Sequence, residues 1–337
     1  MISLENITAE KLDRVRNLNR NSGRQINVEV QFRPEEGENL SSRLNLNVDS
    51  IPSVSRTSES DISLPAEGRK TLFCFFFMFL VFMANLISLA IIHDRTPTKE
   101  QNREKHHPPL RDISFDLASN FSEQNSIYLT IAEILLILTT SCVVVVLLFH
   151  QHKSIIFRRL FFLLAVLFLA RLITMNMTML PISSSTLYHC EAKSKSFVFG
   201  FLISRFLKLL SSLGLCFDGD IKYCGNYVYS GHTVILILNC LMADEYCPLL
   251  IVNYSIKILT ACSISLILIS GFDYTISIII AYYITTRIFW IYHTMANNAF
   301  LKENEATNQI SKEWWFPIFR FLEGNIKHVV PSVYNIY

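Results

Sequence analysis

Long segments without charged side chains constrain this chain more than any other feature. Residues 71–92 form 22 consecutive positions without a charge, and about 20 such residues span the hydrocarbon core of a bilayer as a helix. Arg69 and Lys70 stand directly before this segment, which favours a cytosolic N-terminus because basic flanks stay on the cytosolic side. Since 51% of the 337 residues are hydrophobic, we predict an all-α integral membrane protein.

Five further apolar segments complete a prediction of six transmembrane helices. They run from Ile127 to about Phe149, from Leu160 to about Leu180, from Tyr229 to about Met242, from Tyr254 to about Gly271 and from Ile276 to about Met295. Residues 197–215 are also apolar, but Arg205 and Lys208 interrupt them. We therefore expect an amphipathic helix lying on the membrane there, with a full span as the alternative.

The composition divides the chain into three regions. Residues 1–70 are rich in Asn, Ser, Arg and Glu, so they bury too little apolar surface to fold, and we predict a disordered cytosolic tail. Residues 71–296 form the predicted transmembrane domain, and residues 297–337 a cytosolic C-terminal tail. The net charge of +2 gives no reason to expect a nucleic-acid partner.

The eight cysteines include no C-x-x-C pair, so we expect neither a metal site nor a haem site. Cys190, Cys216 and Cys224 fall in one segment between spans. They could form a disulfide if that segment faces an oxidising lumen, and free thiols are the alternative.

Four charged or titratable residues lie near the outer ends of the predicted spans: Glu133, Arg171, His232 and Arg287. Charged groups inside a membrane usually face a polar cavity or a partner. We interpret them as the lining of a cavity in the outer leaflet whose arginines bind a phosphate, and we expect both arginines to converge near His232. A structural pair between Glu133 and Arg171 is the alternative.

Two polar clusters flank the predicted fourth and fifth spans. Residues 224–233 end in Ser230, Gly231, His232 and Thr233, and residues 271–277 contain Asp273 and Ser277. With a cytosolic N-terminus, the fourth span begins and the fifth span ends on the same, non-cytosolic side. A histidine exchanges protons near neutral pH, so we expect a reaction or binding site where these clusters meet.

Four motifs resemble those of the sphingomyelin synthase family, which belongs with the lipid phosphate phosphatase superfamily. The first is Pro109–Asp112, and the second runs from Arg158 through Arg171 to Pro181. The third is Cys224–Thr233. The fourth comprises Tyr274–Thr275, Ala281–Arg287 and Tyr292–Asn297. Within the fourth motif, Tyr282 and Tyr283 could offer ring faces to a quaternary ammonium group, or they could simply be packing residues.

The resemblance implies six spans, cytosolic termini and a site that faces the lumen or the exterior at the Golgi or plasma membrane. It implies transfer of phosphocholine, or in relatives phosphoethanolamine, from a glycerophospholipid such as phosphatidylcholine to ceramide, with diacylglycerol as the leaving product and no cofactor. One histidine attacks phosphorus. By resemblance, His232 is the second histidine, which protonates the leaving oxygen and later accepts the ceramide proton. Association with copies of itself or with relatives is a further implication.

The sequence departs from the family pattern at three positions. Asp273 stands where the family has the attacking histidine, Ser277 where it has that histidine's orienting aspartate, and Asn226 replaces an aspartate of the third motif. We therefore assign His232, Asp273 and Ser277 as candidate catalytic residues and expect this chain to show little or no phosphocholine transfer to ceramide. Attack by Asp273 itself is one alternative. An inactive member that binds ceramide or phospholipid and partners active relatives is the other. The candidate substrate-binding residues are Glu133, Arg171, Tyr282 and Arg287.

Overall fold

The computed structural model describes residues 67–95, 110–118, 125–180, 199–212, 215, 226–302, 308–313, 315–326, 330 and 334. The predicted disordered tail lies almost wholly outside this range, as do Cys190, Cys216 and Cys224. Within the described residues, five helices are long and apolar enough to cross a membrane: α2 (Gly68–Arg95), α5 (Asn125–Leu148), α6 (Lys153–Met177), α9 (Leu250–Ser270) and α10 (Thr275–Asn297). The chain is therefore a multi-pass, predominantly helical membrane protein, as predicted.

The predicted fourth span corresponds to a shorter helix, α8 (Gly231–Tyr246), of 16 residues. At 1.5 Å per residue it is about 24 Å long, which is less than the roughly 30 Å of a hydrocarbon core. Ten of its residues are buried, because it contacts α5, α6, α9 and α10. The predicted fourth helix is thus present, as a short helix packed among four others.

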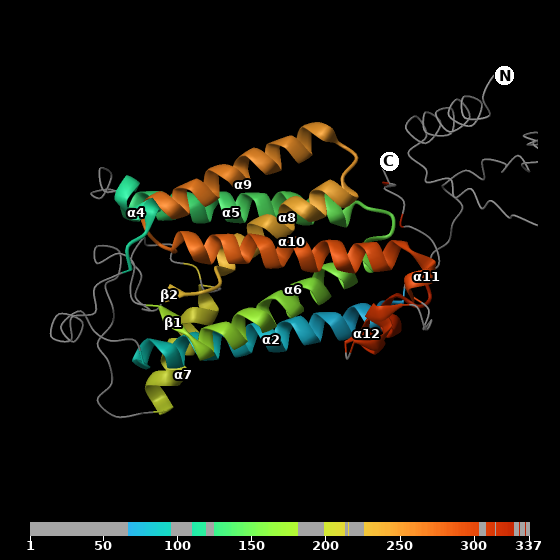
Figure 1. The fold of residues 1–337 in the computed structure, drawn as a ribbon, viewed down its shortest axis with the longest axis horizontal. Helices are drawn as coiled ribbons and strands as arrows, with labels where there is room; N and C mark the ends of the chain where they lie inside the picture. The colour runs from blue at the N-terminus through green and yellow to red at the C-terminus, as the bar shows by residue number, and fades with distance from the viewer. Residues whose placement is uncertain are drawn as a thin grey trace, which may run out of the picture. The chain divides into compact units, whose positions relative to one another are not determined.

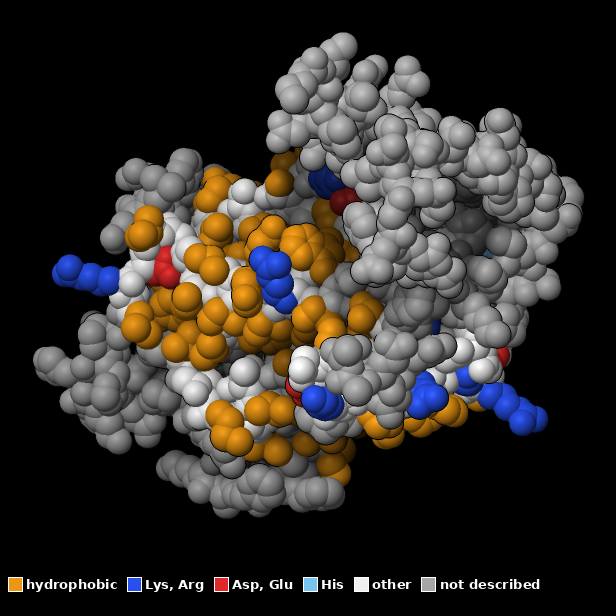
Figure 2. Space-filling view, turned by 45° about the vertical axis from the view of Figure 1, so that its right-hand side comes forward, with side chains coloured by type: hydrophobic (Ala, Val, Ile, Leu, Met, Phe, Trp, Pro, Cys, Tyr) orange, Lys and Arg blue, Asp and Glu red, His pale blue; other side chains and the backbone are white. Residues whose placement is uncertain are grey.

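Four of the five long helices form two packed pairs, and the fifth, α10, lies between the pairs together with α8 (Figure 1). α2 packs along α6, and α5 packs along α9, while α10 contacts both α8 and α6. The outward faces of the pairs carry large exposed apolar side chains, such as Phe76 and Leu80 on α2 and Ile134 and Leu138 on α5. Figure 2 shows hydrophobic side chains spread over the described surface on one side of the molecule. Such a surface suits contact with lipid tails.

The ambiguous segment 197–215 contains α7 (Phe199–Ser211), a helix of 13 residues. Its length of about 20 Å is too short to cross a bilayer. One face buries Arg205 and Leu209, while Ile203 and Leu207 are exposed, and the helix packs against α2. These features fit the amphipathic helix we expected rather than the full span.

Short elements connect the ends of the long helices. β1 (Met179–Leu180) pairs antiparallel with β2 (Asn226–Tyr227), so Met179 faces Tyr227 and Leu180 faces Asn226. This pairing joins the end of α6 to the segment before α8. α4 (Ile113–Ala118) packs against α9. The described part of the C-terminal tail comprises α11 (Ala299–Lys302), the 3-10 helix η4 (Gln309–Lys312) and α12 (Phe316–Glu323).

Candidate functional site

The start of α8 carries the Ser-Gly-His turn. Ser230 is the N-cap residue, and its Oγ accepts a hydrogen bond from the backbone N–H of Thr233 at 3.3 Å. Serine is a preferred N-cap because its oxygen satisfies a donor that the helix leaves free. The backbone N–H of Ser230 donates to the carbonyl oxygen of Ser277 at 3.5 Å. The two polar clusters that we expected to meet are therefore in contact.

Asp112, from the first loop, caps the start of α10. Its Oδ2 accepts the backbone N–H of Thr275 at 2.8 Å, and its Oδ1 accepts the Thr275 hydroxyl at 2.5 Å. Ser114 donates to Oδ1 from both its N–H and its hydroxyl. Burial opposes ionisation of Asp112, but the hydrogen bonds from Thr275 and Ser114 outweigh it and hold the pKa of Asp112 below its ordinary value. The sequence analysis included Asp112 in the first motif but assigned it no role. In the structure, its hydrogen bonds to Thr275 hold the turn that contains Asp273.

Asp273 lies in the turn between α9 and α10 and is only 6% exposed. Its Oδ2 accepts a hydrogen bond from the Ser230 hydroxyl at 2.5 Å. Burial raises the pKa of Asp273, although this hydrogen bond and the nearby charges of His232 and Arg171 act in the opposite direction. The carboxyl group is thus close to both of the predicted cationic groups. Sequence reasoning did not single out Ser230, although its place before an apolar helix marks it as an N-cap.

His232 follows Gly231 in the first turn of α8 and pairs with Glu133 of α5. Its Nε2 lies 3.5 Å from Oε1 of Glu133, and the exposed fractions of the two side chains are 13% and 1%. The imidazole also meets Phe272 edge to face, with 5.0 Å between ring centroids. A carboxylate beside an imidazole orients the ring. The structure therefore places the Glu133 carboxylate beside His232. The alternative that we considered, a Glu133–Arg171 pair, did not include this contact.

Arg171 of α6 packs against the same turn at Gly231, where the absence of a side chain makes room for it. Its Nε donates to the carbonyl oxygen of Tyr229 at 3.4 Å. A Cβ atom at position 231 would lie 3.1 Å from both Cζ and Nε of Arg171. Because Gly231 has no side chain, the guanidinium rests directly against the start of α8. We call Glu133, Arg171, Ser230, Gly231, His232 and Asp273 the His232 cluster.

Arg287 does not join this cluster. It is exposed on α10, with its Cζ 5.3 Å from the ring centroid of Tyr283 and 5.1 Å from that of Trp290. At 1.5 Å per residue it lies about 18 Å along the axis from the start of α10. Thr285 and Phe289 face the core, and a residue two positions away points about 200° around the helix. The expected convergence of both arginines on His232 is therefore met by Arg171 alone.

The other predicted residues on α10 divide in the same way. Ser277 is fully buried and reaches the cluster through its backbone carbonyl. Tyr282 and Tyr283 are 53% and 59% exposed, so their rings lie on the outer face of the helix. The structure thus brings Glu133, Arg171, His232, Asp273 and Ser277 together and leaves Tyr282 and Arg287 outside.

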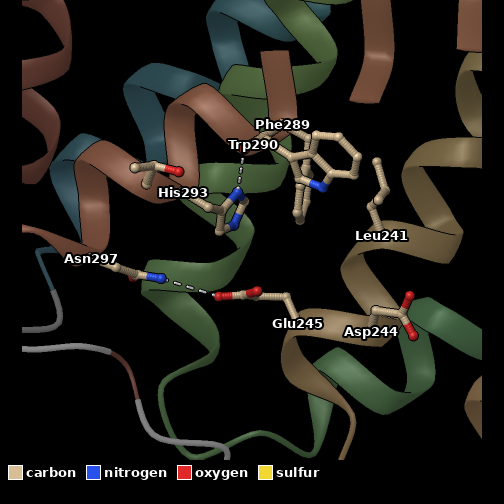
Figure 3. Close-up of a pocket in the computed structure, with 8 residues that line it drawn as sticks. Leu241, Asp244, Glu245, Phe289, Trp290, His293 and Asn297 are labelled. Atoms are coloured by element: carbon tan, nitrogen blue, oxygen red, sulfur yellow. Dashed lines mark hydrogen bonds between the residues drawn. The ribbon is translucent and has the colours of Figure 1, made fainter. Parts of the chain in front are cut away.

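A cavity of about 360 Å³ lies between the far ends of α8 and α10 (Figure 3). Asp244, Glu245, Trp290, His293 and Asn297 are among its lining residues. Within it, the Asn297 amide donates to Glu245 at 3.3 Å. None of the candidate site residues lines this cavity, so it is separate from the His232 cluster. We take the cluster as the candidate functional site because the predicted proton-transfer group and one of the predicted cationic groups meet there.

Comparison with known proteins agrees with the motifs. The family model described as PAP2 superfamily C-terminal matches residues 223–294, which include Ser230, His232, Asp273 and all but the last three residues of α10. Phosphatidylcholine:ceramide cholinephosphotransferase 1 of Rattus norvegicus is 36% identical over 276 residues, covering 80% of this chain and 62% of that protein. The chain thus spans less than two thirds of that relative's length.

Phosphatidylcholine:ceramide cholinephosphotransferase 2 is matched over more of its own length. The Homo sapiens protein is 35% identical over 284 residues, covering 84% of this chain and 75% of that protein. The Rattus norvegicus protein is 33% identical with the same coverage. Identity of this extent, together with the family match over the segment from α8 to α10, shows that the chain belongs to the sphingomyelin synthase, or phosphatidylcholine:ceramide cholinephosphotransferase, family.

Proposed function

We propose that this chain is a sphingomyelin-synthase-type transferase that moves phosphocholine or phosphoethanolamine from a glycerophospholipid to ceramide. The observation that carries the proposal is the His232 cluster, in which a carboxylate-paired imidazole and a guanidinium meet at the start of one helix. The substrates are suggested by the relatives, whose names specify phosphatidylcholine and ceramide. Membrane lipids are therefore the proposed partners of the site.

Each group of the cluster has a part in this reaction. The transferred phosphodiester is an anion, and the guanidinium of Arg171 would neutralise it and hold its oxygens. A lipid alkoxide is a poor leaving group unless it receives a proton, and His232 would supply that proton and later accept the proton of the ceramide hydroxyl. Glu133 would orient the imidazole. The low exposure of the cluster keeps water scarce, which favours transfer over hydrolysis.

A second candidate function rests on Asp273. By resemblance this position holds the attacking imidazole, and here it holds a buried carboxylate. Loss of a nucleophile can lower a rate by on the order of 10⁶, and a carboxylate repels an incoming phosphodiester. The alternative is thus a catalytically inactive member that binds ceramide or phospholipid and partners active relatives.

The arrangement of the tails supports six crossings and cytosolic ends. Glu67, just before α2, pairs with Arg158 at 3.1 Å and accepts a hydrogen bond from Asn325, just after α12. The residues just before α2 and just after α12 thus lie at the same end of the helical region. This fits an even number of crossings, namely the five long helices and α8. Arg69, Lys153 and Arg158 lie at that end, which favours a cytosolic location for it. We propose that the His232 cluster faces the lumen or exterior at the Golgi or plasma membrane.

Transfer is tested with the purified protein in vesicles that contain phosphatidylcholine or phosphatidylethanolamine and a labelled short-chain ceramide. We expect a labelled phosphosphingolipid and an equal amount of diacylglycerol. Binding of labelled ceramide without any product would reject the transferase and support the inactive, lipid-binding alternative.

Restoring the family pattern checks whether the surroundings of the His232 cluster still suit the reaction. Asp273→His with Ser277→Asp should raise transfer, because it supplies an imidazole together with its orienting carboxylate. Asp273→His alone should do less, because an unoriented imidazole spends time in the wrong tautomer. If the double variant gains nothing over a parent that lacks activity, the site no longer supports headgroup transfer.

A further inference from the structure

The contact between Ser230 and Asp273 has no counterpart in a reaction that uses an imidazole nucleophile. The Ser230 hydroxyl donates to Oδ2 of Asp273 at 2.5 Å, and the two residues are 2% and 6% exposed. A buried carboxylate that holds the proton of a neighbouring hydroxyl is arranged as a general base. By resemblance, the aspartate at position 273 replaces the attacking histidine. It also places a base next to another possible nucleophile, the Ser230 hydroxyl.

We propose that Ser230 is the nucleophile of this chain and that Asp273 is its general base. This inference rests on the proposed transferase function and names the atom that attacks phosphorus. It differs from attack by Asp273 itself, because here the carboxylate accepts a proton and forms no bond to phosphorus.

The surroundings of Ser230 suit an oxygen that becomes negative. Its Oγ accepts hydrogen bonds from the backbone N–H and the hydroxyl of Thr233, at 3.3 and 3.1 Å. Loss of the proton to Asp273 adds a lone pair that can attack, while both Thr233 bonds remain. The oxygen also sits at the N-terminus of the 16-residue helix α8, where the helix dipole favours negative charge. Burial, which raises the pKa of Asp273, makes that carboxylate a stronger base than an exposed one.

The other groups that such an attack needs lie beside it. The guanidinium of Arg171 rests on Gly231, the next residue, where it would hold the phosphate oxygens. Nε2 of His232, two residues on, has no hydrogen-bond partner among the described residues and lies 3.5 Å from Glu133. An imidazolium held by Glu133 at Nε2 could give the proton of its other ring nitrogen, Nδ1, to the oxygen that leaves phosphorus.

The two steps balance in atoms and protons. In the first, Asp273 takes the Ser230 proton, Oγ bonds to phosphorus, the bond from phosphorus to the diacylglycerol oxygen breaks, and protonated His232 gives that oxygen its proton. Neutral His232 then takes the proton of the ceramide hydroxyl, and the ceramide oxygen bonds to phosphorus. The Ser230 oxygen leaves and recovers its proton from Asp273. Both residues end in their starting protonation states, and no other reactant is required.

The test is a covalent adduct of the full-length protein in vesicles with headgroup-labelled phosphatidylcholine and no ceramide, quenched in denaturant. We expect the label on Ser230, located by mass spectrometry of peptides and stable to both acid and hydroxylamine, as a serine phosphodiester should be. Label released by hydroxylamine and mapped to Asp273, or acid-labile label on His232, would overturn the inference while leaving the transferase function in place.

Variants separate the nucleophile from the helix cap. Ser230→Ala removes both, whereas Ser230→Asn keeps a side chain that caps a helix as well as serine does but lacks a hydroxyl. We expect both variants to lose adduct and transfer, by about 10⁴-fold or more, with Ser230→Asn unfolding at the wild-type temperature. Transfer retained by Ser230→Asn would show that Ser230 only caps α8. Wild-type protein that binds labelled ceramide but forms neither adduct nor product would reject both this inference and the transferase function.

Discussion

Charged side chains are buried at both ends of the α8–α10 pair, but they differ in their hydrogen bonding. At the far end from His232, the guanidinium of Arg159 donates from Nε and Nη2 to the two oxygens of Glu323, at 3.2 and 2.7 Å. Its Nη1 donates to the hydroxyl of Tyr246 at 3.0 Å, and Tyr292 donates to Glu323 at 3.0 Å. We call these four residues the Arg159 cluster.

Arg159 and His232 differ in how fully their nitrogens are hydrogen-bonded. Every nitrogen of the Arg159 guanidinium has a partner, and the cluster joins α6, α8, α10 and α12. In the His232 cluster, His232 Nε2 lies 3.5 Å from Glu133 and has no hydrogen-bond partner among the described residues. An ion pair in which every nitrogen is hydrogen-bonded holds helices together, whereas the His232 imidazole is held by no hydrogen bond from the described residues at Nε2. Buried charge alone therefore does not mark a reactive site in this fold. Changes at one end should affect transfer, and changes at the other should affect folding.

Of the changes that compare the two ends, His232→Ala should produce the largest effect on transfer. General acid–base groups contribute about 10²–10⁴-fold, and the same imidazole serves both steps here, so we expect a loss near 10⁴-fold. The rate is measured with labelled ceramide in vesicles, and the unfolding temperature is measured in detergent. The matched control is His152→Ala, a half-buried histidine at the opposite end. Transfer by His232→Ala within tenfold of wild type would remove His232 from the reaction.

Glu323→Ala should act on folding instead. Removing one partner of a buried ion pair leaves uncompensated charge and costs about 3–5 kcal/mol, here on Arg159. Thermal unfolding in detergent measures the loss, and the rate per folded molecule should change little. Glu313→Ala is the control, because that carboxylate is exposed. Equal stability of the two variants would show that the Arg159 cluster does not fasten α12.

Gly231→Ala tests the close approach of Arg171 to the His232 cluster. The new methyl group would lie 3.1 Å from the guanidinium, so Arg171 must shift by a few tenths of an ångström. Small misplacement of a binding group is expensive in rate, and we expect about a tenfold loss of transfer with little loss of stability. Gly200→Ala is the matched control, because a Cβ there meets nothing within 4 Å. Equal rates for both variants would mean that the guanidinium position does not matter.

The pH dependence of stability should have opposite signs at the two ends. Burial opposes ionisation of Glu323, but the charge and hydrogen bonds of Arg159 outweigh it, so the pKa of Glu323 is lowered. Its ionised form therefore stabilises the fold above the carboxyl pKa of the unfolded chain, and this contribution is lost as the pH falls through the lowered pKa. The raised pKa of Asp273 means that stability falls as the pH rises from the ordinary carboxyl pKa towards the raised one.

Unfolding temperatures across a pH series separate these contributions. Glu323→Gln should weaken the loss of stability towards acid pH, and Asp273→Asn should weaken the loss on the other side. A pH profile that neither variant changes would show that the two carboxyl groups do not titrate as their environments indicate.

The sequence by itself determined the class of the molecule and the approximate place of its site. Long, mostly apolar segments are a local property of the sequence, so α2, α5, α6, α9 and α10 could be predicted from it directly. The meeting of Ser230 with Ser277 also followed from the sequence, because an even count of helix reversals returns the chain to one side. Five of the seven candidate site residues reach the His232 cluster for this reason.

Only the tertiary structure decided which groups touch. Each residue turns a helix by about 100°, so two helices of known depth can still present different faces to one another. The rotation of each helix about its axis leaves Arg287 exposed, places Glu133 beside His232 and packs Arg171 against Gly231. The Ser230–Asp273 bond and the Asp112 cap join residues 43 and 163 positions apart, and no local pattern encodes contacts at such separations.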